Sequence, residues 1–552
     1  MNPIIPHKGV CDPHIHIFND KAYMYATHDN PGYDNFNMTD WQIWMSDNLV
    51  DWTLEGVEKP EDYYCGPIDQ CWATDAAYRN GKYYWYFSVG SDEIGVGVSE
   101  SPHGPFQDAL GKPLVSIDTQ PKGISKWDPC VFIDDDNTPY LICGACLPLG
   151  FEDIFPPSDS YMIAKLNDDM VSLAEPLKNI VYINNTCPED KPTIHKHNGI
   201  YYLSHSMYYA ISDNVYGPYT YKGYIDAGAD HGCYFSWHNQ TYSATSGPEG
   251  SNEYFRCSLL TYCHYRDNGE IAVDKRILDC GVGQYDANWN IIEAEWYFAS
   301  SRVSKKESPN GGFEIKGIGD GGYLYFPNVY HVEANAAMEF YAASDNHAVI
   351  EIRQDRPDGE LLGSCSVSDT GDKYTQVGCT LSNTAGTKQI YLVFRDAESL
   401  RLDWFTFNTK PESMYKTYPA AYGDLAPIRR RCGAVVPQRT YDPNASNGRI
   451  VNFMDVEGAS VTITGVDGGD GGQAGLLIRY CSEIESRYEL FINGKSYGPL
   501  FFPSTGGRDM RYDGTVMPVM NLSQGKQNEI RIIRIDGAAS FDAFTVCENT
   551  EE

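Results

Sequence analysis

The sequence predicts an all-β protein in which a five-bladed β-propeller precedes two β-sandwich (jelly-roll) domains. A tyrosine-rich strand motif recurs five times in the N-terminal half. Long helical periodicity is hard to find between Met1 and Asp279, where short strands alternate with turns rich in Gly, Asn and Asp. Two further β-rich regions of about 120 residues follow, a length that suits single sandwich domains.

Each repeat is a polar turn followed by an aromatic strand, the pattern of a β-hairpin. The repeats read FNDKAYMY at 18–25, RNGKYYWY at 79–86, DDNTPYL at 135–141, KHNGIYYL at 196–203 and WHNQTY at 237–242. Five repeats predict five blades, because closing the sheets into a ring hides most of their edges. A series of β-sandwiches is the alternative architecture for this region.

Length and composition set the predicted domain boundaries. A chain of 552 residues exceeds one ordinary core, so two to four domains are expected. The composition changes after Asp279, and a linker begins near Pro411. We therefore predict a propeller at 1–284, a first sandwich at 285–410 and a second sandwich at 411–552.

Charge and hydropathy exclude several classes of partner. The formal net charge of −33 repels phosphate backbones and anionic membrane surfaces, so no nucleic-acid partner is expected. No stretch of about 18 apolar residues predicts a membrane span. The N-terminus has no leader-like apolar run, and the 16 cysteines are scattered. These features predict a cytoplasmic protein if the N-terminus is native, or a secreted one if a signal peptide has been removed.

Two Asp-Pro pairs carry the candidate chemistry. Asp12 directly precedes the first tyrosine strand, and Asp128 precedes the third. A single Asp-Pro pair usually starts a turn, but two at equivalent repeat positions favour a function. Inverting hydrolysis of a glycosidic bond needs one carboxylic acid and one carboxylate that activates water, spaced to admit that water. A propeller supplies such groups by directing carboxylates from different blades toward its axis.

The region up to about Asp279 resembles glycoside hydrolase family 43. The matching stretches are CDPH at 11–14, WATD at 72–75, GVGVSESPHGPF at 95–106, WDPCVFIDDD at 127–136 and KHNGIYYL at 196–203. The resemblance implies a five-bladed, inverting enzyme acting on arabinose- and xylose-containing polymers. It also implies that Asp12 is the general base, and that Asp128 orients the general acid and tunes its pKa.

The general acid is where the sequence departs from that family. Members usually carry a glutamate six residues before the lysine that leads into the tyrosine strand. Counting back from Lys196 gives Asp190, and its neighbour is Glu189. Either Asp190 serves with a shorter side chain, or a one-residue bulge presents Glu189. A solvated charged loop is the alternative reading of this segment.

Three more residues of the first region are candidates for the site. The resemblance implies that Trp72 stacks on a sugar ring, because the family places an aromatic residue at this motif, whereas buried tryptophans are more often packing residues. Arg256 matches an arginine that in relatives reaches the substrate, with a surface ion pair as its alternative. His231 resembles a histidine that relatives direct toward a central calcium or water cluster, whereas most lone histidines are not ligands.

The segment from Ile291 to Phe407 resembles carbohydrate-binding module family 6, through IEAEW at 292–296, GGYLYF at 321–326 and LDWF at 402–405. The resemblance implies that Glu293, Glu295 and Asp403 hold a structural calcium, and that Tyr323 and Tyr374 clamp a sugar. Strand packing is the alternative for both tyrosines. In relatives an asparagine usually lies close to the final LDWF stretch, whereas here Arg401 directly precedes that stretch. This difference allows a purely structural module. The third region looks like a more distant relative of the same sandwich class.

Together these features predict an inverting, exo-acting hydrolase that removes terminal pentose from arabinoxylan, xylan or arabinan, without an organic cofactor. An α-L-arabinofuranosidase is the first hypothesis and a β-xylosidase the second, with exo-galactanase or arabinanase as further alternatives. A catalytically silent carbohydrate-binding protein is the hypothesis from a different class. Retention of both Asp12 and Asp128 argues against that last hypothesis.

Overall fold

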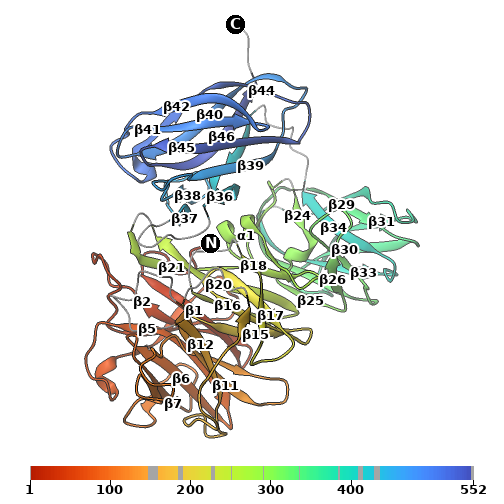
Figure 1. Ribbon diagram of the computed structural model, residues 1–552. Helices are drawn as coiled ribbons and strands as arrows, with labels where there is room; N and C mark the ends of the chain where they lie inside the picture. The colour runs from red at the N-terminus through yellow and green to blue at the C-terminus, as the bar shows by residue number, and fades with distance from the viewer. Residues whose placement is uncertain are drawn as a thin grey trace.

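The computed structural model is almost entirely β-structure (Figure 1), as predicted. It describes residues 2–146, 159–183, 190–225, 231–249, 252–289, 291–334, 336–382, 384, 386–407, 415–427 and 436–548. Within these ranges the one α-helix is α1 (Lys275–Cys280), and short 3-10 turns occur at Pro60–Asp62, Ala294–Trp296, Ala420–Tyr422 and Met510–Tyr512. None of the described helices is long and apolar enough to cross a membrane.

The first region folds into five blades, in which the strands are antiparallel apart from the parallel pair of β14 and β18. The first blade contains β1 (Val10–Phe18), β2 (Lys21–His28), β3 (Trp41–Ser46) and β4 (Thr53–Glu58), and the second contains β5 (Cys71–Arg79), β6 (Lys82–Val89), β7 (Glu93–Ser99), β8 (Gln107–Asp108) and β9 (Val115–Ser116). The third blade contains β10 (Cys130–Ile133), β11 (Pro139–Cys146), β12 (Asp159–Lys165) and β13 (Lys178–Asn179), and the fourth contains β14 (Tyr182–Ile183), β15 (Thr193–His197), β16 (Ile200–His205), β17 (Tyr208–Ser212) and β18 (Tyr219–Tyr224). The fifth blade contains β19 (Gly232–Trp237), β20 (Gln240–Glu249), β21 (Asn252–Tyr265) and β22 (Ile271–Val273).

One strand from each blade faces the propeller axis. Strand β1 contacts β5, β5 contacts β10, β10 contacts β15, β15 contacts β19, and β19 contacts β1. These contacts close the ring. The tyrosine-rich repeats form the hairpins that follow each inner strand, and their aromatic side chains fill the space between blades, as where Trp41 meets Trp85 edge to face.

The second region packs two sheets face to face. One sheet contains β23 (Tyr285–Asp286), β25 (Ala299–Ser301), β28 (Tyr323–Val332), β30 (Ala348–Gln354), β31 (Leu361–Val367) and β33 (Gly386–Arg395). The other contains β24 (Ile292–Glu293), β26 (Ser304–Glu307), β27 (Phe313–Lys316), β29 (Ala337–Ala343), β32 (Thr375–Thr380) and β34 (Arg401–Phe407). Buried Phe326 and Phe405 meet edge to face between the sheets.

This sandwich is docked on the fifth blade. The side-chain amide of Gln240 donates hydrogen bonds of 2.8 Å to the carbonyl oxygens of Glu295 and Tyr297. The hydroxyl of Tyr242 donates to the carbonyl of Phe298 at 3.0 Å. One apolar cluster runs from the propeller into the sandwich core, so the two regions share a continuous interior.

The third region, coloured blue in Figure 1, is also a two-sheet β-structure. One sheet contains β36 (Asp424–Ala426), β39 (Ser460–Val466), β41 (Ser486–Ile492), β42 (Lys495–Phe502) and β45 (Asn528–Asp536). The other contains β35 (Tyr415–Pro419), β37 (Gln438–Tyr441), β38 (Arg449–Asn452), β40 (Gly472–Ser482), β43 (Asp513–Val516), β44 (Val519–Leu522) and β46 (Ala539–Glu548). Strand β37 pairs with β20 through Glu249 and Tyr441, which joins this sheet to the fifth blade.

Candidate active site

The two Asp-Pro pairs adopt the same unusual backbone conformation. Asp12 has φ 51° and Asp128 has φ 49°, in the left-handed region that few non-glycine residues adopt. The backbone N–H of Asp12 donates to Oγ of Ser246 on β20 at 2.6 Å, and that of Asp128 donates to Oγ of Ser88 on β6 at 2.8 Å. In both cases the serine lies on the second strand of the preceding blade. The sequence equivalence of the two pairs is therefore a structural equivalence as well.

Asp12 is buried and held as a carboxylate. Arg256 donates from Nη1 to Oδ1 at 2.8 Å and from Nη2 to Oδ2 at 3.1 Å, and Thr27 Oγ1 donates to Oδ2 at 2.7 Å. Burial by itself raises the pKa of Asp12, but Arg256 and His231 together hold that pKa well below its ordinary value. Asp12 is thus ionised across the neutral range, as a general base must be.

Arg256 is fixed from its other side. Its Nε donates to Oδ2 of Asp29 at 3.0 Å, and its Nη2 donates to Oδ1 of the same carboxylate at 3.0 Å. The guanidinium also lies 4.9 Å from the ring centre of Phe36, which is partly exposed. The arginine is 4% exposed, so the alternative interpretation, a surface ion pair, is wrong. Arg256 instead lies buried between the carboxylates of Asp12 and Asp29.

Asp128 lies in a different electrostatic environment, although it is also buried. Burial raises its pKa, the neighbouring carboxyls of Asp190 and Asp12 raise it further, and His231 and Lys191 oppose them, so that the pKa of Asp128 is about 7. The protein thus contains one carboxyl that stays ionised and another that retains a proton near neutral pH. This separation of pKa values is what acid and base roles require.

His231 lies between these carboxyls. Its Nδ1 is 3.2 Å from Oδ1 of Asp12, and its Nε2 is 2.9 Å from Oδ1 of Asp190 and 3.9 Å from Oδ2 of Asp128. The ring therefore separates Asp12 on one side from Asp128 and Asp190 on the other. Asp128, Asp190 and His231 also satisfy the spacing of a metal-binding group. Calcium at His231 stays a prediction. Glu189 lies outside the described residues.

The third X-Pro position belongs to the fourth blade. Lys191 precedes Pro192 and has φ 53°, as Asp12 and Asp128 do before their prolines. Its Nζ donates to the carbonyl oxygen of Thr74 at 3.2 Å across the axis. A lysine therefore occupies the turn that carries a carboxylate in blades one and three, and Asp190 stands immediately before it.

Trp72 lies at the start of β5 and is partly buried. Its ring centre is 5.5 Å from that of Trp127, the residue before Asp128. The structure therefore places Trp72 beside the segment that carries a candidate catalytic residue. Whether it stacks on a sugar stays a prediction.

The predicted calcium ligands of the sandwich influence one another electrostatically. Burial and Asp403 raise the pKa of Glu293 to about 8, and burial and Glu293 raise that of Glu295 well above its ordinary value. Oε2 of Glu295 is buried and makes no hydrogen bond to any described residue. In the described part of the chain, the carboxylate oxygens of Glu293, Glu295 and Asp403 do not all lie within 4.8 Å of one another. Their chemistry suits a hard cation such as Ca²⁺.

The predicted sugar clamp is divided between two sheets. Tyr323 begins β28 and packs against Tyr391 at 5.4 Å. Tyr374 precedes β32 of the opposite sheet, packs against Tyr341 at 5.2 Å, and donates its hydroxyl hydrogen to Glu314. Among the described aromatic contacts, none joins Tyr323 to Tyr374.

Sequence reasoning missed the residues that support the catalytic carboxyls. Asp29 and Phe36 fix Arg256, and Ser88 and Ser246 hold the two turns. Asp29 follows Thr27 and His28 at the end of a tyrosine strand, and this position was the one local feature of the sequence that could have indicated it as a site residue. The serines lie inside ordinary strands, where nothing in the sequence distinguishes them.

Residues 1–240 match the family described as Glycosyl hydrolases family 43. A xylosidase/arabinosidase 43A of Humicola insolens is 33% identical over 279 residues, which cover 41% of this chain and 82% of that protein. The chain belongs to glycosyl hydrolase family 43. As a family 43 enzyme it is a glycoside hydrolase, in agreement with the carboxyl pair described above.

The second region of this family 43 enzyme matches Carbohydrate binding module (family 6) over residues 293–409. An arabinoxylan arabinofuranohydrolase of Paenibacillus polymyxa is 28% identical over 486 residues, 75% of this chain and 76% of that protein. A solved family 43 β-xylosidase/α-arabinofuranosidase from a compost metagenome, complexed with xylotriose in a calcium-free form, is 30% identical. It has a TM-score of 0.42 and covers 49% of this chain and 96% of that one.

Proposed function

We propose that this enzyme removes terminal α-L-arabinofuranosyl residues from arabinoxylan or a related hemicellulose, with inversion at the anomeric carbon. The carrying observation is the pair of carboxyl environments on either side of His231, one ionised and one protonated near neutral pH. The names of the relatives support the pentose, since they include arabinoxylan arabinofuranohydrolase and xylosidase/arabinosidase.

In the proposed reaction Asp12 accepts a proton from a water molecule, whose oxygen attacks the anomeric carbon. The bond from that carbon to the leaving oxygen breaks, and a protonated carboxyl on the far side of the sugar donates its proton to the leaving oxygen. Arg256 keeps Asp12 ionised and oriented. The attack and the departure occur on opposite faces, so the product has inverted configuration.

We assign the general acid to Asp190. It is the described acidic residue of its loop, it contacts Nε2 of His231 at 2.9 Å, and its charge contributes to the raised pKa of Asp128. Its side chain is 32% exposed, which leaves it accessible to a leaving group. Asp128, whose pKa is about 7, acts as a second carboxyl that shares a proton with Asp190.

Release of nitrophenol from an aryl α-L-arabinofuranoside tests the assignment. We compare wild type with Asp12→Ala, Glu189→Gln and Asp190→Asn. Loss of turnover in Asp12→Ala together with a larger loss in Asp190→Asn than in Glu189→Gln supports the proposal. A larger loss in Glu189→Gln than in Asp190→Asn would transfer the acid role to Glu189. An active Asp12→Ala enzyme would refute the assignment of Asp12 as the general base.

A β-xylosidase is the second candidate, because the name of one relative, the xylosidase/arabinosidase 43A of Humicola insolens, joins both activities. The aryl β-D-xyloside is assayed in parallel. Higher kcat/KM on the xyloside would favour this candidate, while no turnover of either glycoside would direct the search to galactosides, arabinan or a binding role.

We further propose that Glu293, Glu295 and Asp403 hold a structural calcium ion. The orphaned Oε2 of Glu295 and the mutual repulsion of the carboxyls support this, because a bound cation relieves both. After EGTA treatment, Ca²⁺ is expected to raise the Tm of wild type and to have no effect on Glu295→Gln. Equal shifts in both proteins would place calcium elsewhere.

A further inference from the structure

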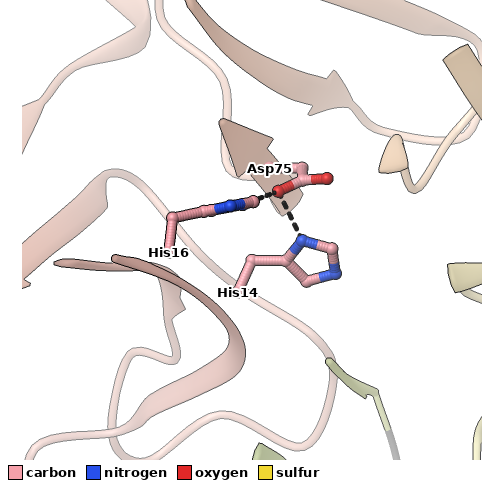
Figure 2. Close-up of side chains that lie close together, drawn as sticks. All are labelled: His14, His16 and Asp75. Carbon is pink, nitrogen blue, oxygen red and sulfur yellow. Dashed lines mark hydrogen bonds and ion pairs between the residues drawn. The ribbon is translucent and has the colours of Figure 1, made fainter. Parts of the chain in front are cut away.

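Two histidines and one aspartate that the proposed mechanism does not use converge near the propeller axis. His14 and His16 are two residues apart on β1, so their side chains leave the same face of the strand. Figure 2 shows both rings directed at Asp75, which lies on β5 of the next blade. Nδ1 of His14 is 2.5 Å and Nε2 of His16 is 2.6 Å from Oδ1 of Asp75.

The contact between His14 and Asp75 is short and buried. Thr193 donates its hydroxyl hydrogen to the carbonyl oxygen of Gly232 at 3.1 Å, so toward Nε2 of His14, at 3.5 Å, its oxygen can only accept. When a metal ion binds Nδ1, the ring proton of His14 lies on Nε2, and the Thr193 oxygen can accept it there.

Without a proton, Nδ1 of His14 directs a lone pair at a carboxylate oxygen 2.5 Å away. Two electron-rich atoms so close repel each other unless a proton or a metal ion lies between them. The same oxygen also accepts from the backbone N–H of Ala76 at 2.7 Å, and Oδ2 of Asp75 accepts from the backbone N–H of Val131 at 2.6 Å. Asp75 is thus oriented by the backbone, with the two imidazoles arranged around one oxygen.

We propose that His14, His16 and Asp75 bind a divalent transition-metal ion of the Zn²⁺ type. Two imidazole nitrogens and one carboxylate oxygen are a ligand set that Zn²⁺ prefers over Ca²⁺ or Mg²⁺. Ligand atoms around a tetrahedral Zn²⁺ are about 3.3 Å apart, so the side chains need to open by less than about 1 Å. Thr193 and the N–H of Val131 serve as the outer hydrogen-bond partners that orient such ligands.

The strand itself provides a route for the ion. Burial decreases along β1, and the side chain of His16 is 28% exposed whereas that of His14 is 3% exposed. A water molecule on the side of His16 completes the coordination. The bound ion links blade one to blade two, so it stabilises the closed ring. This role is independent of the proposed hydrolase activity.

The test uses the full-length protein after removal of metal by a chelator and dialysis. Co²⁺ is added, and visible absorption together with elemental analysis reports the geometry and the stoichiometry. Wild type is expected to bind one equivalent with the intense bands of a four-coordinate site. His16→Gln is expected to weaken binding at least tenfold, and Thr193→Ala, which retains all three ligands, to weaken it about tenfold.

Two matched controls separate this site from other histidine sites. His28→Gln changes a histidine that contacts Asp40 at 2.9 Å without a second imidazole. His231→Gln disrupts the other described metal-spaced group. Both are expected to bind Co²⁺ at the His14 site as wild type does. Absence of Co²⁺ bands in folded wild type, or Co²⁺ binding as tight as that of wild type in both His16→Gln and Thr193→Ala, would show that His14 and Asp75 share only a proton and would overturn the proposal.

Discussion

One guanidinium, that of Arg256, binds two buried carboxylates. Asp12 and Asp29 occupy opposite sides of its planar fork, which only an arginine can present in two bidentate contacts. One negative charge remains, and His231 lies next to it. The ionisation of Asp12 is therefore a property of this three-residue arrangement rather than of the Asp-Pro turn.

Replacement of the base tests this arrangement at the level of one residue. Asp12→Asn is expected to lower kcat by about 10²–10⁴-fold, the contribution typical of general base catalysis, with little change in KM. Kinetics on the aryl arabinofuranoside provide the measurement. Asp168→Asn, at a carboxyl that is 82% exposed on the propeller surface, is the matched control and should retain wild-type rates.

The raised pKa of Asp128 predicts the alkaline limb of activity. Asp128 and Asp190 are neighbouring carboxyls, and the pKa of Asp128 is about 7. As the pH rises through about 7, the pair loses its shared proton, and kcat/KM therefore falls. In Asp128→Asn the pair loses the carboxyl that binds a proton near pH 7, so the alkaline limb is expected to move to lower pH. A pH profile of kcat/KM measures this, and an unmoved limb would separate Asp128 from the acid.

The Asp-Pro turns act as elements rather than as single side chains. Each turn is an irregularity at the start of an inner strand, and each is supported by a serine from the preceding blade. Ser88→Ala leaves the buried N–H of Asp128 without its partner, which costs about 1–3 kcal/mol. We expect a lower Tm and a lower kcat, measured by thermal unfolding and kinetics. Ser364→Ala, at an exposed serine of β31, should change neither.

A buried ion pair couples the propeller to the third region of the molecule. Arg449 of β38 donates from Nη1 to Oδ1 of Asp279 in α1 at 3.1 Å, and both side chains are almost fully buried. Burial raises the pKa of Asp279 to about 6 despite Arg449 and Arg439. Desolvation therefore exceeds the attraction, as is common for buried pairs.

Breaking the pair is expected to destabilise the whole chain. Asp279→Asn leaves Arg449 buried without its counter-ion, at a cost of about 3–5 kcal/mol. The double variant Asp279→Leu with Arg449→Met lacks both charges of the pair and should unfold at a higher temperature than the single variant. Thermal unfolding of the full chain compares them. A single variant as stable as wild type would indicate that water or Arg439 compensates the loss.

The repeats and Asp-Pro pairs predicted much of the fold and part of the site. Each hairpin is encoded within a few residues, so the five blades were visible as five local patterns. Asp12 and Asp128 were visible because equivalent turns repeat. Asp29, Ser88 and Ser246 were not, because their contacts join segments that are distant in the chain, as the separation of 234 residues between Asp12 and Ser246 illustrates.

The sequence alone thus determined the all-β class, the number of blades and the pair of candidate catalytic aspartates, since strand, turn and repeat signals are local. Only the tertiary structure decided which carboxyl is ionised, because pKa values depend on burial and on charges such as Arg256, which lies 244 residues from Asp12. It also decided that His14 and His16 meet Asp75, because ring closure, rather than sequence proximity, brings neighbouring blades together at the axis.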